Sequence, residues 1–278
     1  MKGMSLVSTY GEELLKLQSI ELDILKEVIR ICDKFNVKYF ILGGTLLGAI
    51  RHKGFIPWDD DIDIGMTRDN YNKFLEVAEY ELSDEFFLQT FKTEPNTPFY
   101  FAKVRKKGTK FVEEYCKDLD IEHGIFLDIF PYDNVPDNEK NRKKQLRKVN
   151  LWSNLFIAKS LKGSSVPQDS FMGKVKIIIR AIFHYLLKPI SKSYLFKKLD
   201  EAAQEFNHTD TKMKSFVKYP YLMIPSDDLK TLEQIEFEGI SVCCPSNPRE
   251  YMRHQYGDFM KLPPEEKRVG HRPYKLEL

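Results

Sequence analysis

The chain has 278 residues, of which 42% are hydrophobic and 30% are charged, a composition typical of a folded globular protein with a substantial core. Its 43 Lys and Arg nearly balance 41 Asp and Glu, and the net charge of +2 argues against a general nucleic-acid binder. Because we find neither an apolar signal core near the N-terminus nor an apolar run of about 18 residues, we expect a cytoplasmic protein.

The first half of the chain has the pattern of alternating helices and short strands. Apolar residues recur at helical spacing over 12–35, and the pattern then changes to that of a buried strand over 38–42. A second helix is expected over 45–52, and a third, capped by Thr67, through residue 80. Further strands are expected over 61–66, 86–91, 99–104, 110–115 and 124–130, the last of them broken by Pro131.

The second half is more helical and more basic. Helices are expected over 138–162, 171–187 and 193–206, whereas the tail from Tyr219 onward gives no clear pattern. The chain is therefore predicted to be α+β, with a catalytic core in 1–137 and a mainly helical part in 138–278 that completes the substrate site. The cysteines fit neither a disulfide framework nor a zinc motif, so we expect free thiols at Cys32, Cys116, Cys243 and Cys244.

Acidic residues are concentrated directly after Trp58. Four acids occupy five positions there: Asp59, Asp60, Asp61 and Asp63. Asp61 and Asp63 would lie on the same face of a strand, and Asp128 would join them from a neighbouring strand. Because Mg²⁺ prefers oxygen ligands, with Mn²⁺ as the alternative, we predict that these three aspartates are the metal ligands and the catalytic residues.

Two glycines end the strand that precedes the helix expected over 45–52. Backbone N–H groups at such a point can approach a phosphate closely, although an ordinary tight turn would have the same sequence. We expect the substrate-binding residues around this turn and the acids, namely Gly43, Gly44, Thr45, Arg51, His52, Lys53, Trp58 and Asp59. For the basic residues of this set, a solvated loop is the alternative.

Three blocks of the sequence resemble the LicD-type phosphocholine transferases, a family that also resembles the catalytic domain of fukutin-related protein. The first block covers 40–65 and contains the Gly-Gly pair and the acidic segment, the second covers 124–133 around Asp128, and the third covers 256–268. The resemblance implies a nucleotidyltransferase fold with a mixed β-sheet flanked by helices. In this fold the metal ligands correspond to Asp61, Asp63 and Asp128, and Gly43 and Gly44 correspond to the phosphate turn.

The resemblance also implies the reaction. The donor would be CDP-linked, typically CDP-choline, and the acceptor would be a sugar hydroxyl of a cell-surface glycan precursor of the teichoic acid or lipopolysaccharide type, with release of CMP. Choline is a quaternary ammonium, which proteins usually hold against aromatic rings. The aromatic candidates are Trp58, Tyr100, Tyr132, Tyr251 and Tyr256.

Three alternatives remain open at this point. The same site could transfer another CDP-linked unit, such as ribitol phosphate or glycerol phosphate. A glycosyltransferase that uses a nucleotide sugar could also use the paired aspartates, although the upstream Gly-Gly turn argues against this class. A non-catalytic metal-binding scaffold would keep the acids for structure alone.

One basic segment is compatible with a membrane surface. Residues 174–198 contain seven Lys or Arg and no acid, interleaved with apolar residues. Such a segment could contact anionic headgroups at the inner face of the membrane, which would suit a lipid-linked acceptor. A core helix with solvated basic ends is the alternative.

Overall fold

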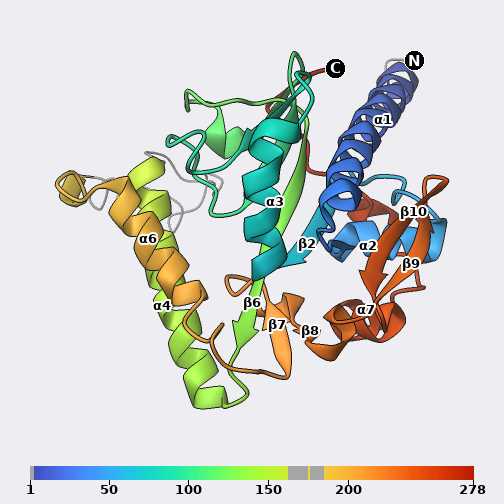
Figure 1. The fold of residues 1–278 in the computed structure, drawn as a ribbon. Helices are drawn as coiled ribbons and strands as arrows, with labels where there is room; N and C mark the ends of the chain where they lie inside the picture. The colour runs from blue at the N-terminus through green and yellow to red at the C-terminus, as the bar shows by residue number, and fades with distance from the viewer. Residues whose placement is uncertain (1–2, 162–174, 176–184) are drawn as a thin grey trace.

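A computed structural model describes residues 3–161, 175 and 185–278 (Figure 1). The α-helices in these residues are α1 (Gly3–Phe35), α2 (Gly43–His52), α3 (Arg68–Glu81), α4 (Glu139–Ser160), α6 (Lys192–Ala203) and α7 (Pro248–Tyr256). Single 3-10 turns are η1 (Glu114–Cys116), η2 (Pro220–Leu222), η3 (Asp227–Leu229) and η4 (Glu265–Lys267). The strands are β1 (Phe40–Ile41), β2 (Asp63–Thr67), β3 (Phe86–Gln89), β4 (Ala102–Lys106), β5 (Lys110–Val112), β6 (Phe126–Val135), β7 (Met213–Ser215), β8 (Ile224–Pro225), β9 (Leu232–Phe237), β10 (Ile240–Pro245) and β11 (Lys275–Glu277).

The central sheet is mixed and has β6 at its centre. Its order is β1-β2-β6-β4-β3, with β7 added to the far part of β6 and β8 added to β7. The β2–β6 pair is parallel, and the other pairs are antiparallel. Two further two-stranded sheets pair β9 with β10 and β5 with β11. The predicted α+β class, with a mixed sheet flanked by helices, is confirmed.

Two helices cover one face of this sheet. α1 contacts α3, β4 and β6, and α3 also contacts β2 and β6, as Figure 1 shows. The apolar stripe predicted for the first helix packs into the core, with Leu17, Ile24, Leu25, Val28 and Ile31 all buried. Burial of each such side chain contributes roughly 1.5–3 kcal/mol, so α1 provides a stable base for the strands beside it.

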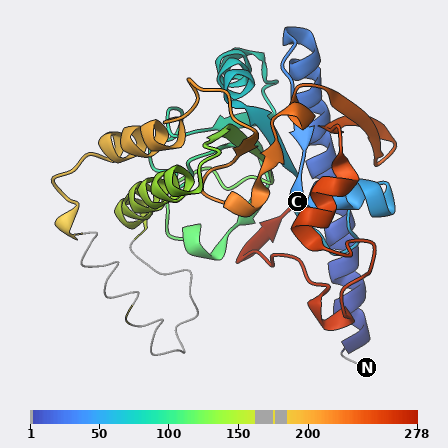
Figure 2. The same ribbon diagram turned by 90° about the horizontal axis from the view of Figure 1, so that it is seen from below.

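The helical part lies at the opposite end of the molecule from α1. α4 and α6 pack side by side, in both Figure 1 and Figure 2. Asn138 caps α4, because its side chain accepts a hydrogen bond from the backbone N–H of Asn141 at 3.1 Å. A small apolar cluster of Phe156, Ala158, Leu187 and Leu195 lies between the two helices. β7, which follows α6, returns the chain to the central sheet.

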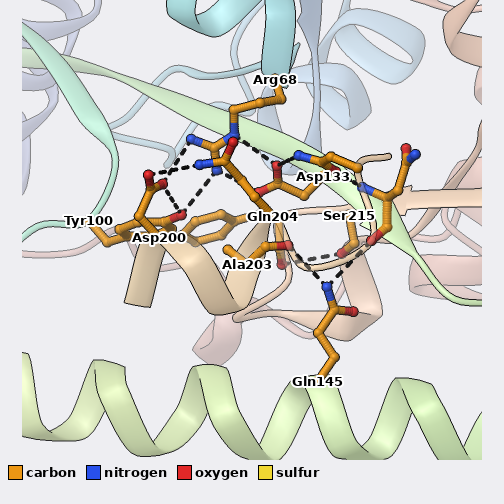
Figure 3. A network of polar contacts seen from close by, with 11 residues as sticks. Arg68, Tyr100, Asp133, Gln145, Asp200, Ala203, Gln204 and Ser215 are labelled. Atoms are coloured by element: carbon orange, nitrogen blue, oxygen red, sulfur yellow. Dashed lines mark hydrogen bonds and ion pairs between the residues drawn. The ribbon is translucent and has the colours of Figure 1, made fainter. Parts of the chain in front are cut away.

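A buried polar network joins this helical part to the sheet (Figure 3). Arg68, at the start of α3, makes a two-point ion pair with Asp133 of β6, at 2.8 and 2.6 Å. The same guanidinium binds Asp200 of α6 at 3.2 Å and the Tyr100 hydroxyl at 3.0 Å. Gln145 of α4 donates to the carbonyl of Ala203 at 3.0 Å. α4, α6, α3 and β6 are thus tied together by charged and polar side chains.

Some element boundaries differ from the sequence expectation. β2 begins at Asp63, so Asp61 precedes the strand instead of belonging to it. α2 begins at Gly43, so the glycines form the first turn of a helix and not a separate turn before it. β6 continues through Pro131. On one side of β6, pairing with β4 ends at Ile129 and pairing with β7 begins at Asp133, so the proline lies between the two and no hydrogen bond from its nitrogen is needed there.

The remaining expectations concern thiols and the membrane. Cys32, Cys116, Cys243 and Cys244 are free, as predicted. Within the described part of the chain, no helix combines the length and the apolar character needed to cross a membrane. In the basic segment 174–198, residues 174 and 176–184 lie outside the described residues, as does most of the helix predicted over 171–187.

Candidate active site

Asp63 and Asp128 are positioned by neighbouring parallel strands. The two residues are register partners of β2 and β6. The backbone N–H of Asp63 donates to the Thr45 hydroxyl at 2.9 Å, and the backbone N–H of Asp128 donates to the carbonyl of Ile62 at 3.0 Å. Thr45, which was predicted to bind substrate, therefore anchors β2 from the first turn of α2.

A cavity of about 540 Å³ is lined by all three predicted metal ligands, Asp61, Asp63 and Asp128. Asp61 reaches it from the extended segment before β2, and its side chain is 28% exposed. Asp128 is 8% exposed. The volume lies in the range of small-molecule sites in proteins. The structure thus brings the three predicted residues to the wall of one cavity, although Asp61 does not share a strand with Asp63.

The carboxylates of this site destabilise each other's charged forms. Burial, followed by the charges of Asp61 and Asp128, raises the pKa of Asp63 well above its usual range. Burial raises the pKa of Asp128 to about 6, with Lys103 acting in the opposite direction. Burial and the charges of Asp61 and Asp60 raise the pKa of Asp59 to about 7. A bound cation would relieve this repulsion, so the residues present fit a divalent metal.

The sequence reading missed a buried acid on α1. Glu21 is 1% exposed, and its Oε2 has no hydrogen-bond partner in the part of the chain that the structure describes. Burial raises the pKa of Glu21, and the charges of Asp61 and Asp60 raise it further, so this carboxyl group faces the acidic segment. An acid on the apolar stripe of the first helix, between Leu17 and Leu25, was the sequence signal for it.

Lys103 of β4 is a second functional residue that the sequence reading missed. Its Nζ lies 2.9 Å from Asp128 Oδ1 and 3.7 Å from Glu113 Oε2, and its side chain is 1% exposed. The ammonium also lies 3.4 Å from the ring centroid of Phe126. Lys103 and Arg105 alternate with apolar residues in a buried strand, which was the available signal.

Asp60, Asp61 and His271 form a second acidic group, in which one ligand atom from each residue lies within 4.8 Å of the others. Asp60 Oδ1 accepts hydrogen bonds from the His271 backbone N–H at 2.9 Å and is 3.2 Å from its Nδ1. The bond to Asp60 raises the pKa of His271 to about 9. Asp60 and His271 thus form an ion pair that holds the acidic segment, and the three residues together are a second group that could hold a cation.

The two glycines lie where α2 approaches the acids. A Cβ at Gly43 would stand 3.5 Å from Asp63 Oδ2, and one at Gly44 would stand only 2.6 Å from Asp59 Oδ2. Gly43 also has a positive φ of 55°. The first turn of α2 therefore lies close to the acidic site, and its role in phosphate binding stays a prediction.

Other predicted substrate-binding residues lie apart from the cavity. Arg51 donates to the carbonyl of Phe259 at 3.0 Å and to His52 at 2.9 Å, at the far end of α2. Lys53 pairs with Glu236 at 3.3 Å and lines a different groove. The Trp58 ring is 5.6 Å from the guanidinium of Arg268.

Aromatic rings form a continuous wall along the cavity. Among the aromatic candidates, Tyr100 lines it, whereas Trp58, Tyr132, Tyr251 and Tyr256 are not among its lining residues. The lining rings missed by the sequence reading include Phe99, Phe101, Tyr115, Phe130, Phe216, Tyr219 and Tyr221. Successive centroids are 4.6 Å apart for Phe101 and Phe130, 5.0 Å for Phe130 and Phe216, and 5.5 Å for Phe216 and Tyr219. Most of these rings come from segments that are far apart in the sequence, so no local motif marks them.

A second cavity, of about 470 Å³, meets the first at the acids. Both are lined by Asp61, Glu113, Tyr115, Asp128 and His271. The remaining wall of the second cavity includes Phe111 of β5 and Pro273, which precedes β11. Carboxylates shared by two cavities can act on two substrates that approach from different sides.

Comparison with known proteins agrees with the resemblance. Residues 36–154 match the family model described as LicD/FKTN/FKRP, nucleotidyltransferase domain. The chain is 28% identical over 257 residues to the lipopolysaccharide cholinephosphotransferase LicD of Haemophilus influenzae, covering 91% of this chain and 94% of that protein. The predicted resemblance is therefore confirmed.

Two further relatives match over shorter stretches. An uncharacterized protein of Rickettsia typhi is 44% identical over 135 residues, which are 46% of this chain and 39% of that protein. The human ribitol 5-phosphate transferase FKRP is 46% identical over 39 residues, which are 14% of this chain and 8% of that protein. The similarity to FKRP is thus confined to a short stretch.

Proposed function

Because residues 36–154 match the LicD/FKTN/FKRP family model, we propose that this chain transfers phosphocholine from CDP-choline to a sugar hydroxyl of a cell-surface glycan precursor. The observation that carries the proposal is the cavity in which the three aspartates and the aromatic wall meet. The acids suit a metal that binds phosphate oxygens, and the rings suit a quaternary ammonium. The name of the Haemophilus relative supports both the choline and a lipopolysaccharide-type acceptor.

In the proposed reaction, the acceptor oxygen attacks the phosphorus that bears choline. The bond from this phosphorus to the bridging oxygen breaks, CMP leaves with the electron pair, and a carboxylate of the site takes the hydroxyl proton. Asp61, Asp63 and Asp128 would hold the metal, Mg²⁺ or Mn²⁺, which neutralises charge on the phosphates. The first turn of α2, with Gly43 and Gly44, would contribute backbone N–H groups.

The aromatic wall favours choline over the polyol units of the alternative donors. Ribitol phosphate and glycerol phosphate carry hydroxyl groups that need hydrogen-bond partners in a buried site. Choline has no N–H donor and is stabilised by ring faces. Phe101 and Phe130, which line the cavity with ring centroids 4.6 Å apart, offer such faces.

The decisive experiment compares donors. Purified protein is incubated with Mg²⁺, a lipopolysaccharide or teichoic acid acceptor, and CDP-choline, CDP-ribitol or CDP-glycerol separately, and CMP is measured. The proposal expects CMP from CDP-choline above the other two donors. If CMP appears only with CDP-ribitol or CDP-glycerol, the transferred unit is ribitol phosphate or glycerol phosphate and not phosphocholine. No turnover with any donor would favour the metal-binding scaffold.

A lipid-linked acceptor would place the reaction near a membrane, and we include contact through residues 174–198 in the proposal. In its described part, Leu186 is 65% exposed and Lys188 lies 4.6 Å from the ring centroid of Tyr185. Exposed apolar and basic side chains together suit an anionic headgroup layer. Co-sedimentation with vesicles should increase with the anionic lipid content, and binding that is independent of it would rule this contact out.

A further inference from the structure

Lys218 is a cation in the active-site cavity that has no anionic partner among the described residues. It lies in the turn between β7 and η2 and lines the cavity together with Asp61, Asp63 and Asp128. Its Nζ is 5.4 Å from the ring centroid of Tyr219. Within the described residues, Lys218 forms no ion pair with a carboxylate and no side-chain hydrogen bond.

The other buried or partly buried lysines of the described chain have partners. Lys103, in the same cavity, pairs with Asp128 at 2.9 Å. Lys192 donates to the carbonyls of Pro95 and Thr97, at 2.8 and 2.7 Å. Burial lowers the pKa of Lys218, and no nearby carboxylate acts against this effect. Among the described residues, the Tyr219 ring is therefore the only group recorded against this partly buried charge, and no anion balances it.

We propose that Lys218 binds the phosphate oxygens of the CDP-linked donor and is a positioning residue for the transfer. This inference rests on the proposed function. A diphosphate approaching Asp61, Asp63 and Asp128 is repelled wherever their charge is not neutralised, and a fixed ammonium on the same cavity wall offsets this repulsion. The phosphate in turn is the anion that Lys218 lacks, because its oxygens can accept a charge-assisted hydrogen bond from Nζ.

The position of Lys218 also orients the donor. A quaternary ammonium is repelled by Lys218, so the phosphates and not choline should lie at this end of the cavity. Choline would then lie along lining rings other than Tyr219, whose centroid is 5.4 Å from Lys218 Nζ. Arg51, His52 and Lys53 do not line this cavity and cannot substitute for Lys218 without movement of α2.

The test uses the full chain with Lys218→Met, which keeps the length of the side chain without its charge, and Lys218→Arg, which keeps the charge. Lys212→Met is the matched control, because Lys212 is exposed nearby in the sequence and does not line the cavity. The probes are inorganic pyrophosphate with Mg²⁺ and CDP-choline with Mg²⁺, measured by calorimetry. Thermal unfolding without ligand is measured in parallel.

Lys218→Met should weaken binding of both probes by about tenfold or more, as expected for a hydrogen bond to a charged group. Lys218→Arg should restore most of the affinity, and Lys212→Met should leave it unchanged. The ligand-free melting temperature of Lys218→Met should stay level or rise, because an unpaired, partly buried charge is removed. A purely structural lysine would instead lower both melting temperature and affinity.

Unchanged pyrophosphate and CDP-choline affinity in Lys218→Met would overturn the inference, and so would an equal loss in Lys218→Arg. If Lys218→Met does not fold, Lys218→Gln provides the neutral variant under the same criteria. Failure of the choline proposal is distinguishable. Wild-type protein would then release CMP from CDP-ribitol or CDP-glycerol, while weaker pyrophosphate binding by Lys218→Met would still identify Lys218 as a phosphate-binding residue.

Discussion

Asp63 and Asp128 are direct register partners across the parallel β2–β6 pair, and both line the same cavity. Parallel register partners project to the same face of a sheet, so the two carboxylates approach a common ligand from adjacent strands. Asp61 joins them from the segment before β2. This arrangement predicts that metal binding depends on the paired aspartates more than on the nearby Asp60.

The first prediction separates these acids. Asp63→Asn and Asp128→Asn should each abolish the rise in melting temperature caused by Mg²⁺ and lower the rate of CMP release by about a hundredfold or more. Asp60→Asn is the matched control, because Asp60 is held by His271 and does not line the main cavity. Mg²⁺ stabilisation that survives in Asp63→Asn but disappears in Asp60→Asn would move the metal to the Asp60–Asp61–His271 group.

The second prediction concerns pH. Without metal, the folded protein keeps protons on Asp128 and Asp59 up to pKa values of about 6 and 7, whereas the usual value is 3.8. The unfolded chain loses these protons first, so the free energy of unfolding should fall as pH rises from about 4 to about 7. The pKa of His271 is raised from its usual value of 6.5 to about 9, so its protonated form adds stability that is lost as the pH rises from 6.5 to about 9.

Melting temperatures in EDTA from pH 4 to 9 check this expectation. Saturating Mg²⁺ should flatten the fall between pH 4 and 7, because the metal binds the ionised carboxylates. His271→Gln should lower the melting temperature mainly below pH 6.5, where the imidazolium contributes fully, and should remove the fall between pH 6.5 and 9. Melting temperatures that rise with pH in EDTA would contradict the proposed repulsion among the acids.

The third prediction tests the close approach of α2. Gly44→Ala places a Cβ 2.6 Å from Asp59 Oδ2, which must move. Because a displacement of about 1 Å near the chemistry costs about a hundredfold in rate, CMP release should fall strongly while the fold persists. Gly11→Ala, an exposed helical position with no atom within 4 Å of the new Cβ, is the control and should be neutral or slightly stabilising. Full activity in Gly44→Ala would show that Asp59 tolerates displacement.

Local patterns in the sequence were sufficient for much of the fold. The spacing of apolar residues placed α1, and Asn138 marked the start of α4. The acidic segment and Asp128 also stood out, because acids beside strand patterns are uncommon. The ends of β2 and β6 were harder to place, since they depend on pairing with other strands. Pro131 is tolerated only because β4 and β7 leave a gap beside it.

The rest of the site depends on contacts between distant segments. Lys103 and Glu21 approach the acids from β4 and α1, and Lys218 lines the same cavity from the turn after β7. A lysine that pairs with a buried aspartate looks the same in sequence as one on a solvated strand. Likewise, the basic residues of 51–53 are close to Gly43 and Gly44 in sequence. They lie at the C-terminal end of α2, however, so the length of this helix separates them from its first turn.

The last prediction tests the network that joins the helical part to the sheet. Arg68→Met would leave Asp133, which is 1% exposed, as an uncompensated buried charge and should reduce the free energy of unfolding by about 3–5 kcal/mol. Since Arg68 also holds the hydroxyl of Tyr100, which lines the cavity, donor binding should weaken as well. Chemical denaturation measures the first effect and calorimetry with CDP-choline the second.

Lys143→Met is the matched control for this network, because its ion pair with Glu139 is exposed on α4 and should be worth less than about 0.5 kcal/mol. Combining Arg68→Met with Asp133→Leu should recover part of the stability lost in the single variant, since the unpaired carboxylate is then removed. If Arg68→Met unfolds at the same denaturant concentration as Lys143→Met, the network does not couple α6 to β6, and the position of Tyr100 in the cavity must depend on ring packing with Phe196 and Phe216.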